Sequence, residues 1–134
     1  HYAYSDDQIN FDVSQIEVLE GGNKIIGKKR GTIKTNDGVI INADEFEYDK
    51  IKNILKAKGN ITVKDEVNDY IVNSENILYL KDQEKIQLKG KSSSLIFSNF
   101  NFKSEDLIIL RDKLILESNK PTTIIENDVL EKGS

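Results

Sequence analysis

The sequence predicts an all-β chain built from about four copies of a two-strand unit. Three observations support this fold class. A short motif returns after 31 and then 30 residues, apolar residues alternate with polar ones, and turn signals separate the alternating segments. Alternation at a period of two is typical of a strand with one buried face, because successive side chains point to opposite sides of the sheet.

The repeat is clearest where its copies begin. The copies that start at Ala43, Ser74 and Ser104 open with a small residue, continue with acidic or amide residues, and place apolar residues three and five positions later. A more divergent copy starts at Val13. Fixed internal periods of this size indicate a repeat architecture. Within a single domain of residues 1–134, the predicted units are 13–42, 43–73, 74–103 and 104–126.

Each unit is predicted to hold two short strands, which are rich in the β-branched and aromatic residues that strands prefer. The alternating apolar pairs are, in chain order, Ile16 and Val18, Phe46 and Tyr48, Ile61 and Val63, Ile77 and Tyr79, Ile86 and Leu88, Leu107 and Ile109, and Leu114 and Leu116.

Turn signals lie between these strands. Asp37-Gly38 is the strongest, because this dipeptide supplies the positive φ angles of a tight hairpin turn. Pro121, the only proline, falls in the last turn, where it interrupts no central strand. The predicted turns are Gly21-Gly22-Asn23, Asn36-Asp37-Gly38, Asp49-Lys50, Gly59-Asn60, Asp82-Gln83 and Asn119-Lys120-Pro121.

A unit of two strands cannot bury its own apolar stripe. Stacking successive units side by side buries one shared stripe, which predicts a quasi-one-dimensional sandwich or solenoid. Such a stack has two open ends, whose backbone groups stay unpaired unless a cap or a partner covers them.

The composition excludes several classes of function. Nineteen basic and 23 acidic residues give a net charge of −4, which argues against a nucleic-acid binder. The chain has no Cys, and its single histidine is His1, so thiolate chemistry and nearly all His-dependent mechanisms are absent. No run approaches the ~20 apolar residues of a membrane-spanning helix. The absence of Met predicts a processed chain or a fragment of a longer one.

Acidic clusters at 6–7, 44–47, 65–69 and 105–106 are the first candidates for chemistry. Paired carboxylates can hydrolyse a glycoside. These clusters, however, recur with the repeat and alternate with Lys, so we interpret them as solvated faces. The segment Asp65–Asp69 has oxygen ligands suited to calcium but lacks the glycine and the closing glutamate of an EF-hand loop. It is predicted to be a turn.

Two further segments carry polar side chains in a row. Ser92-Ser93-Ser94 has no histidine partner that could activate a nucleophile. It stands where the preceding unit has Ile61 and Val63, which predicts a weak or flexible strand. Lys28-Lys29-Arg30 is the only basic run, and it forms either a solvated loop or a contact for lipid phosphates. We predict no catalytic residue, no metal site and no cofactor.

Residues 43–49 read Ala-Asp-Glu-Phe-Glu-Tyr-Asp, and residues 55–63 read Leu-Lys-Ala-Lys-Gly-Asn-Ile-Thr-Val. This wording resembles the repeat of the OstA-like family, which comprises the periplasmic lipopolysaccharide-transport proteins LptA and LptC and the N-terminal domain of LptD. The third unit keeps Ser74, Tyr79 and Gly90, whereas the fourth has no glycine. The regular unit is more similar to the N-terminal domain of LptD than to LptA.

The resemblance implies a folded-over β-jellyroll that is open along one side. It further implies a non-catalytic periplasmic module that holds lipopolysaccharide acyl chains in an apolar groove and passes them toward the outer membrane. Its partners would be other jellyroll domains, or a second copy, paired edge to edge at the open ends. The expected groove-lining residues are Ile16, Val18, Ile33, Phe46, Tyr48, Ile54, Ile61, Val63, Ile77, Tyr79, Ile86, Leu88, Leu107, Ile109, Leu114 and Leu116.

A structural β-solenoid of a surface or adhesin protein, with no lipid ligand, is the alternative. It explains the repeat and the alternation equally well. It does not explain the specific Ala-Asp and Gly-Asn wording of the second unit.

Overall fold

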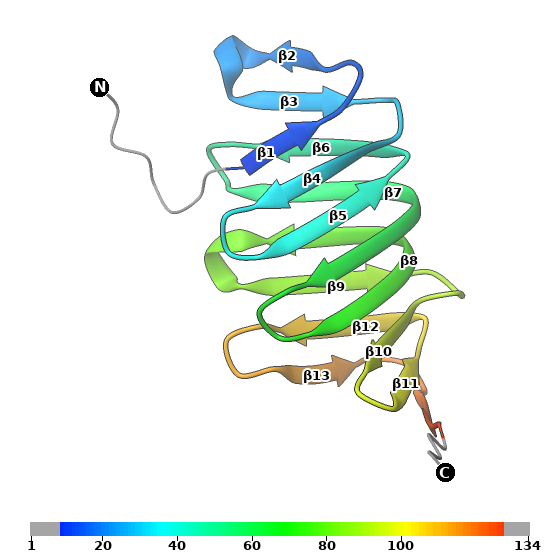
Figure 1. Cartoon of the computed structure of the whole chain (residues 1–134). Helices are drawn as coiled ribbons and strands as arrows, with labels where there is room; N and C mark the ends of the chain where they lie inside the picture. Colours follow the sequence, from blue (N-terminus) through cyan, green and yellow to red (C-terminus); the bar gives the residue numbers. More distant parts are fainter. Residues whose placement is uncertain (1–8, 128–134) are drawn as a thin grey trace.

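The computed structural model describes residues 9–127, and most of these residues form antiparallel strands (Figure 1), which confirms the predicted all-β class. The part of the chain that is described holds two 3-10 helices of three residues, neither long and apolar enough to cross a membrane. The strands are β1 (Ile9–Asp12), β2 (Glu17–Leu19), β3 (Lys24–Gly27), β4 (Gly31–Thr35), β5 (Val39–Ala43), β6 (Glu45–Asp49), β7 (Ile54–Asp65), β8 (Tyr70–Leu80), β9 (Lys85–Lys89), β10 (Ser94–Phe97), β11 (Phe100–Lys103), β12 (Asp106–Leu110), β13 (Ile115–Ser118) and β14 (Thr123–Glu126).

The strands form one continuous sheet that folds over on itself. Its first face, here called sheet one, has the order β1-β4-β5-β7-β8-β10-β11-β14. Its second face, sheet two, follows from the remaining pairings and has the order β2-β3-β6-β7-β8-β9-β12-β13. The two long central strands, β7 and β8, belong to both faces: their halves pair with different neighbours on either side of a bend.

The bends lie along one side of the molecule, the right side in Figure 1, which we call the spine. In β7 the pairing with β8 shifts between Lys58 and Ile61, where Gly59 and Asn60 have φ values of +86° and +47°. The prediction that Gly59-Asn60 forms a turn between two separate strands is therefore wrong. The two residues form an irregularity within a continuous strand, because both halves of β7 remain paired with β8.

Hairpin turns lie along the opposite side, the left side in Figure 1, which we call the open side. Turns of sheet one, such as 36–38 and 66–69, face turns of sheet two, such as 81–84 and 111–114. In the turn at Asn36-Asp37-Gly38 only Gly38 has a positive φ, +92°, so Asp37 does not take the left-handed conformation that we predicted.

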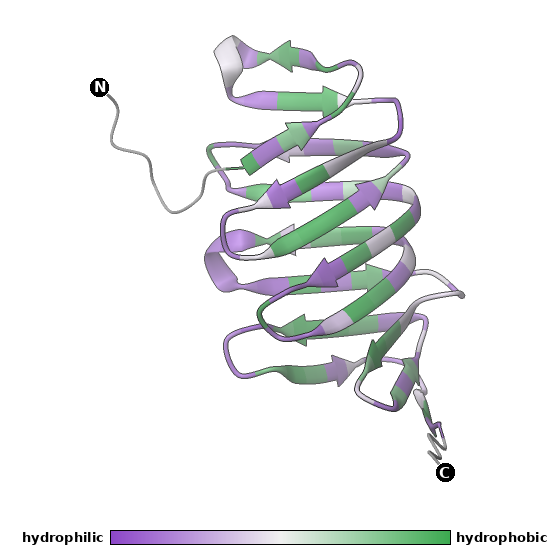
Figure 2. Ribbon diagram, in the orientation of Figure 1, coloured by the Kyte–Doolittle hydropathy of each residue, from purple (hydrophilic) through white to green (hydrophobic). Residues whose placement is uncertain are grey.

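The core fills the space between the two faces. Ile33, Ile41, Val63 and Val72 stand side by side across sheet one, and each has no exposed surface. An equivalent row of sheet two consists of Tyr48, Leu55, Tyr79, Ile86 and Ile109. Figure 2 shows the same alternation of apolar and polar residues along the strands. Burying both rows against each other is the main source of stability for such a stack.

Candidate functional site

The apolar interior is the site that the sequence predicts, and most of the predicted lining residues face it. Eleven of the sixteen are buried between the sheets, and Leu114 and Leu116 pack partly buried against them. Lipid binding by these residues stays a prediction. The eleven buried residues are Ile33, Phe46, Tyr48, Ile61, Val63, Ile77, Tyr79, Ile86, Leu88, Leu107 and Ile109.

Ile54 does not face the interior as predicted. It is half-buried and stands next to Asp49 and Leu80, whereas its neighbour Leu55 has no exposed surface. Two adjacent apolar residues in a strand point to opposite faces, so the pair Ile54-Leu55 does not reveal by itself which one is inside. In the structure, Leu55 is the residue of this pair that faces the interior.

Ile16 and Val18 are exposed, to 42% and 57%, although we predicted an inward position for both. Val18 stands opposite Ile25, which packs against the core, so it continues an inward row. Strand β2, however, is the last strand of sheet two at this end. Among residues 9–127 no further strand covers β2, so the last residue of this inward row, Val18, is exposed.

Several core residues escaped the sequence prediction. The predicted lining set omits Val39, Ile41, Val72 and Leu95, which are fully buried. The signal was present, since Val39 and Ile41 alternate with Ile40 and Asn42. Ile40 obscures this period, because an apolar residue also occupies the outward position.

The small residues that open each repeat lie at the spine. Ala43, Ser74 and Ser104 are all buried at the bends between the two faces. Ser74 Oγ lies 2.8 Å from Ser93 Oγ, and Ser104 Oγ lies 2.8 Å from Ser118 Oγ. Hydroxyls can thus pair with each other across the bend and remain satisfied while buried.

The run Ser92-Ser93-Ser94 belongs to one of these bends. Ser93 is 1% exposed and hydrogen-bonded, and β10 begins at Ser94. Leu95 follows and fills the core position opposite Val72. Ser92 and Ser93 thus lie in the bend before the strand, and only Ser94 belongs to β10.

The signature residues of the second unit form a hydrogen-bonded bend. The backbone N–H of Asp44 donates to Gly59 O at 3.0 Å, and Asn60 Nδ2 donates to Asp44 Oδ2 at 2.7 Å. A side chain at position 59 would meet Asp44 at 2.8 Å, which explains the glycine. Arg30 Nη1 donates to Asp44 Oδ1 and Asn60 O, each at 2.9 Å. Hydrogen bonds from Asn60 and Arg30 lower the pKa of Asp44.

The ion pair with Asp44 gives Arg30, one residue of the basic run at 28–30, a structural role at the spine. Lys28, Lys29 and Arg30 are all exposed, and Arg30 is engaged with Asp44 at the spine. The run thus lies outside the apolar interior. Contact with lipid phosphates stays a prediction.

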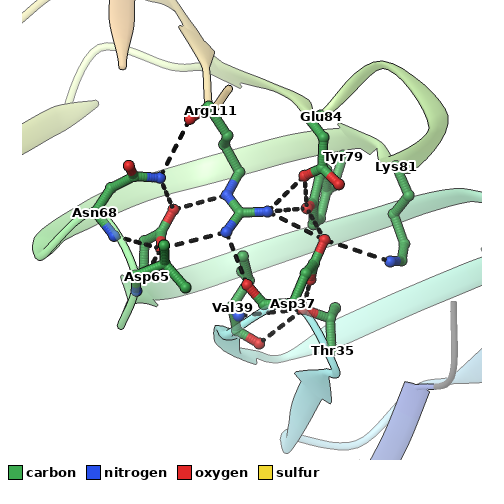
Figure 3. A network of polar contacts seen from close by, with 10 residues as sticks. Thr35, Asp37, Val39, Asp65, Asn68, Tyr79, Lys81, Glu84 and Arg111 are labelled. Atoms are coloured by element: carbon green, nitrogen blue, oxygen red, sulfur yellow. Dashed lines mark hydrogen bonds and ion pairs between the residues drawn. The ribbon is translucent and has the colours of Figure 1, made fainter. Parts of the chain in front are cut away.

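A cluster of buried polar side chains joins the two sheets on the open side (Figure 3). Arg111, directly after β12 of sheet two, is 7% exposed and lies at its centre. Its Nε donates to Asp65 Oδ2 at 2.7 Å, and its Nη2 donates to Asp65 Oδ1 at 3.3 Å and to Asp37 O at 2.9 Å. Asp65 and Asp37 both belong to sheet one, so the guanidinium connects the faces.

The remaining guanidinium nitrogen, Nη1, contacts two residues of sheet two and the Asp37 carboxylate of sheet one. Arg111 Nη1 donates to Glu84 Oε1 at 2.5 Å, to Tyr79 Oη at 2.7 Å and to Asp37 Oδ2 at 3.1 Å. The Tyr79 hydroxyl lies 2.9 Å from both Asp37 Oδ2 and Glu84 Oε1. Lys81 Nζ, also buried, lies 3.8 Å from Asp37 Oδ2. Paired buried charges with several hydrogen bonds avoid the cost of an isolated ion.

The pKa values of the cluster follow from these contacts. Burial alone would raise the pKa of Asp65, but hydrogen bonds from Arg111 and Asn68 outweigh it and lower the pKa to about 2. Burial would also raise the pKa of Asp37, and hydrogen bonds from Thr35 and Tyr79 lower it. Burial raises the pKa of Glu84, since it outweighs the hydrogen bond from Tyr79.

Because the pKa of Asp65 is lowered on folding, the free energy of unfolding depends on pH in the acid range. Its folded pKa of about 2 lies below its value in an unfolded chain, so its contribution is complete above pH ~4 and is lost as the pH falls through about 2. The stabilisation is of the order of 2 kcal/mol. We expect Asp65→Asn to be less stable than the wild type at pH 6, and this difference to vanish toward pH 2. Urea unfolding of both proteins at a series of pH values measures this, and a pH-independent difference would contradict it.

This cluster is not among the sites predicted from the sequence. Residues 65–69 do form the predicted turn, in which Asp65 accepts hydrogen bonds from the backbone N–H groups of Val67 and Asn68. The prediction of a solvated face is wrong for Asp65, which has no exposed surface. Its second role depends on Arg111, which is 46 residues away. The one available signal was that Arg111 is one of only two arginines among 19 basic residues.

The remaining acidic residues form no metal site in the described part of the chain, where no group of three or more His, Asp or Glu lies in suitable geometry. The predicted cluster at Asp6-Asp7 and His1 lie outside the described residues.

A shallow depression of about 560 Å³ lies on the outer face of sheet two, away from the interior. Lys28, Lys56, Lys58 and Lys89 surround it together with two glutamates. The two pairings Glu45–Lys58 and Glu47–Lys56 place opposite charges side by side across neighbouring strands. Such cross-strand pairs stabilise a solvated sheet face.

No protein-family model matches the sequence, and no curated protein matches it. Among solved structures, the chain is similar to LptH, described as the LptA homologous periplasmic component of the conserved lipopolysaccharide transport device from Pseudomonas aeruginosa. The TM-score is 0.80 at 10% sequence identity, and the match covers 91% of this chain and 96% of LptH. The chain therefore has the open β-jellyroll fold of an LptA-like protein.

Proposed function

We propose that the protein is a non-catalytic module of lipopolysaccharide transport that holds acyl chains between its two sheets. The observation that carries the proposal is a continuous apolar interior within the fold of a periplasmic lipopolysaccharide-transport component. Aliphatic side chains such as Ile61, Ile77 and Leu88 suit alkyl chains, because they offer apolar surface and no competing hydrogen bonds. The proposal places the protein in the periplasm and needs no cofactor.

The partners in this proposal are other jellyroll domains, or a second copy, added edge to edge. Exposed apolar residues at both ends of the stack support this edge-to-edge pairing. At one end Val18 of β2 is 57% exposed, and at the other Ile124 of β14 is 58% exposed. Both residues extend inward rows, since Val18 pairs with Ile25 and Ile124 pairs with Phe102. An added strand would pair with the free backbone groups and would extend the apolar interior.

We further propose that the chain is the N-terminal domain of an LptD-type outer-membrane assembly protein, with LptA as the alternative. The support is the regular unit with Tyr48-Asp49 and Gly59-Asn60. The sequence of the parent gene distinguishes the two. A following series of amphipathic segments of ~10 residues supports an LptD-type protein, because transmembrane β-strands have that length and pattern.

Photo-cross-linking in living cells tests the lipid proposal. A small diazirine side chain at the inward positions Ile61 and Leu88 is expected to form a lipopolysaccharide adduct. The matched controls are Thr62 and Gln87, the neighbours that point to the outer face of the same strands. Adducts at the inward positions alone support the conduit. No adduct at any position in a folded, exported protein would overturn it and would favour a structural β-solenoid.

A further inference from the structure

The two sides of the molecule are closed by different means. On the spine the chain itself runs from one face to the other, and β7 and β8 carry hydrogen-bonded pairing through the bend. On the open side each hairpin turn returns into its own sheet, so contacts between the faces there depend on side chains. Opening the molecule at this side breaks no strand pairing.

The Arg111 cluster supplies such contacts near the middle of the open side. The guanidinium reaches Asp65 and Asp37 of sheet one, and the Tyr79 hydroxyl of sheet two reaches the same Asp37 carboxylate. A further contact runs from Asn68 Nδ2 to the carbonyl oxygen of Arg111 at 3.4 Å. Ile86, which stands opposite Tyr79 in the pairing of β8 with β9, belongs to the apolar interior and has no exposed surface.

We propose that the Arg111 cluster is a latch on the open side, which must release before an acyl chain can enter the interior from that side. This inference rests on the proposed function, since it concerns access to the same interior. The latch consists of Arg111, Asp65, Asp37, Tyr79, Glu84 and Lys81.

Two properties suit the cluster to this role. First, the interior is closed: core side chains of both sheets have almost no exposed surface, so an alkyl chain fits between them only after the faces separate. Second, the closing contacts are ionic. When they separate, the charged groups regain their hydration, which offsets much of the lost attraction, whereas separated apolar groups gain nothing from water.

The partial exposure of the cluster supports release toward solvent. The side chains of Asp37 and Glu84 are 25% and 30% exposed, so water already reaches the outer edge of the latch. Asp65, by contrast, is fully buried and forms the inner contact with Arg111. Release would thus proceed from Asp37 and Glu84 inward.

A reversible cross-link across the open side tests the latch. The chain contains no Cys, so Asp37→Cys with Glu84→Cys introduces a unique pair, one residue from each sheet. Both native carboxylates lie 2.9 Å from one hydroxyl oxygen, which places the new thiols within reach of a short, reducible bis-thiosulfonate reagent. The readout is the lipopolysaccharide adduct of a diazirine at Ile61.

We expect the cross-linked protein to lose the adduct by on the order of tenfold or more, and reductant to restore it, because the covalent bridge removes the open state. The matched control is the same bridge on the spine, at Arg30→Cys with Asp44→Cys, where the native side chains lie 2.9 Å apart. That bridge should leave the adduct unchanged.

Equal adducts in the bridged and reduced forms would overturn the latch and leave the proposed function intact. No adduct in any form, the wild type included, would overturn the proposed function and the latch with it.

Tyr79→Phe provides a second test of the latch if the variant with the two cysteines does not fold. It removes one oxygen that joins the sheets, and it should raise the adduct roughly two- to tenfold, in line with one lost hydrogen bond. An unchanged yield would contradict the latch.

Discussion

Replacement of Arg111 with methionine is expected to lower the free energy of unfolding by about 3–5 kcal/mol. The guanidinium donates two hydrogen bonds to Asp65, whose side chain has no exposed surface. Without Arg111, the Asp65 carboxylate would remain buried without the partner whose hydrogen bonds lower its pKa. A loss of this size is a large part of the total stability of a typical domain. Urea unfolding at pH 7 measures it.

A double variant separates the unpaired charge from the lost packing. Asp65→Asn keeps an oxygen that can accept from the backbone of Val67 and Asn68 but removes the negative charge. Arg111→Met with Asp65→Asn should therefore be more stable than Arg111→Met alone. The control Arg30→Met breaks an exposed ion pair and should cost less than about 1 kcal/mol. Equal losses at Arg30 and Arg111 would contradict the account of a buried cluster.

Truncation of Leu55 to alanine is expected to cost about 2–5 kcal/mol, whereas truncation of Ile54 should cost no more than about 1 kcal/mol. Leu55 has no exposed surface and stands between Tyr48 and Tyr79 in the core row of sheet two. Ile54 is half-buried on the outer face. The two residues are neighbours in β7, so they share the same strand, pairing and local backbone.

The measurement is the unfolding midpoint of both alanine variants under identical conditions. The cavity left by Leu55 cannot close easily, because it lies between two packed faces. A larger loss at Ile54 than at Leu55 would show that β7 presents its other face to the interior, as the sequence analysis expected for Ile54. The pairing of β7 with β6 and β8 would then be shifted by one residue.

Much of the interior was predictable, because a strand with one buried face leaves a local pattern. Phe46 and Tyr48, or Ile86 and Leu88, are each separated by one polar residue, and all four are buried. The prediction failed where apolar residues are adjacent, as at Ile54-Leu55, and where the stack ends, as at Val18. In neither place does the local pattern say what lies opposite.

The sequence by itself determined that the chain is all-β, that its small residues recur at a fixed period and that its interior is apolar. These properties follow from the spacing of apolar, polar and small residues along the chain, which the sequence itself contains. Only the tertiary structure decided that Gly59-Asn60 bends a continuous strand and that Arg111 joins Asp65 and Tyr79 across the open side. These features depend on residues that are distant in sequence and meet only when the sheet folds over, so no local pattern records them.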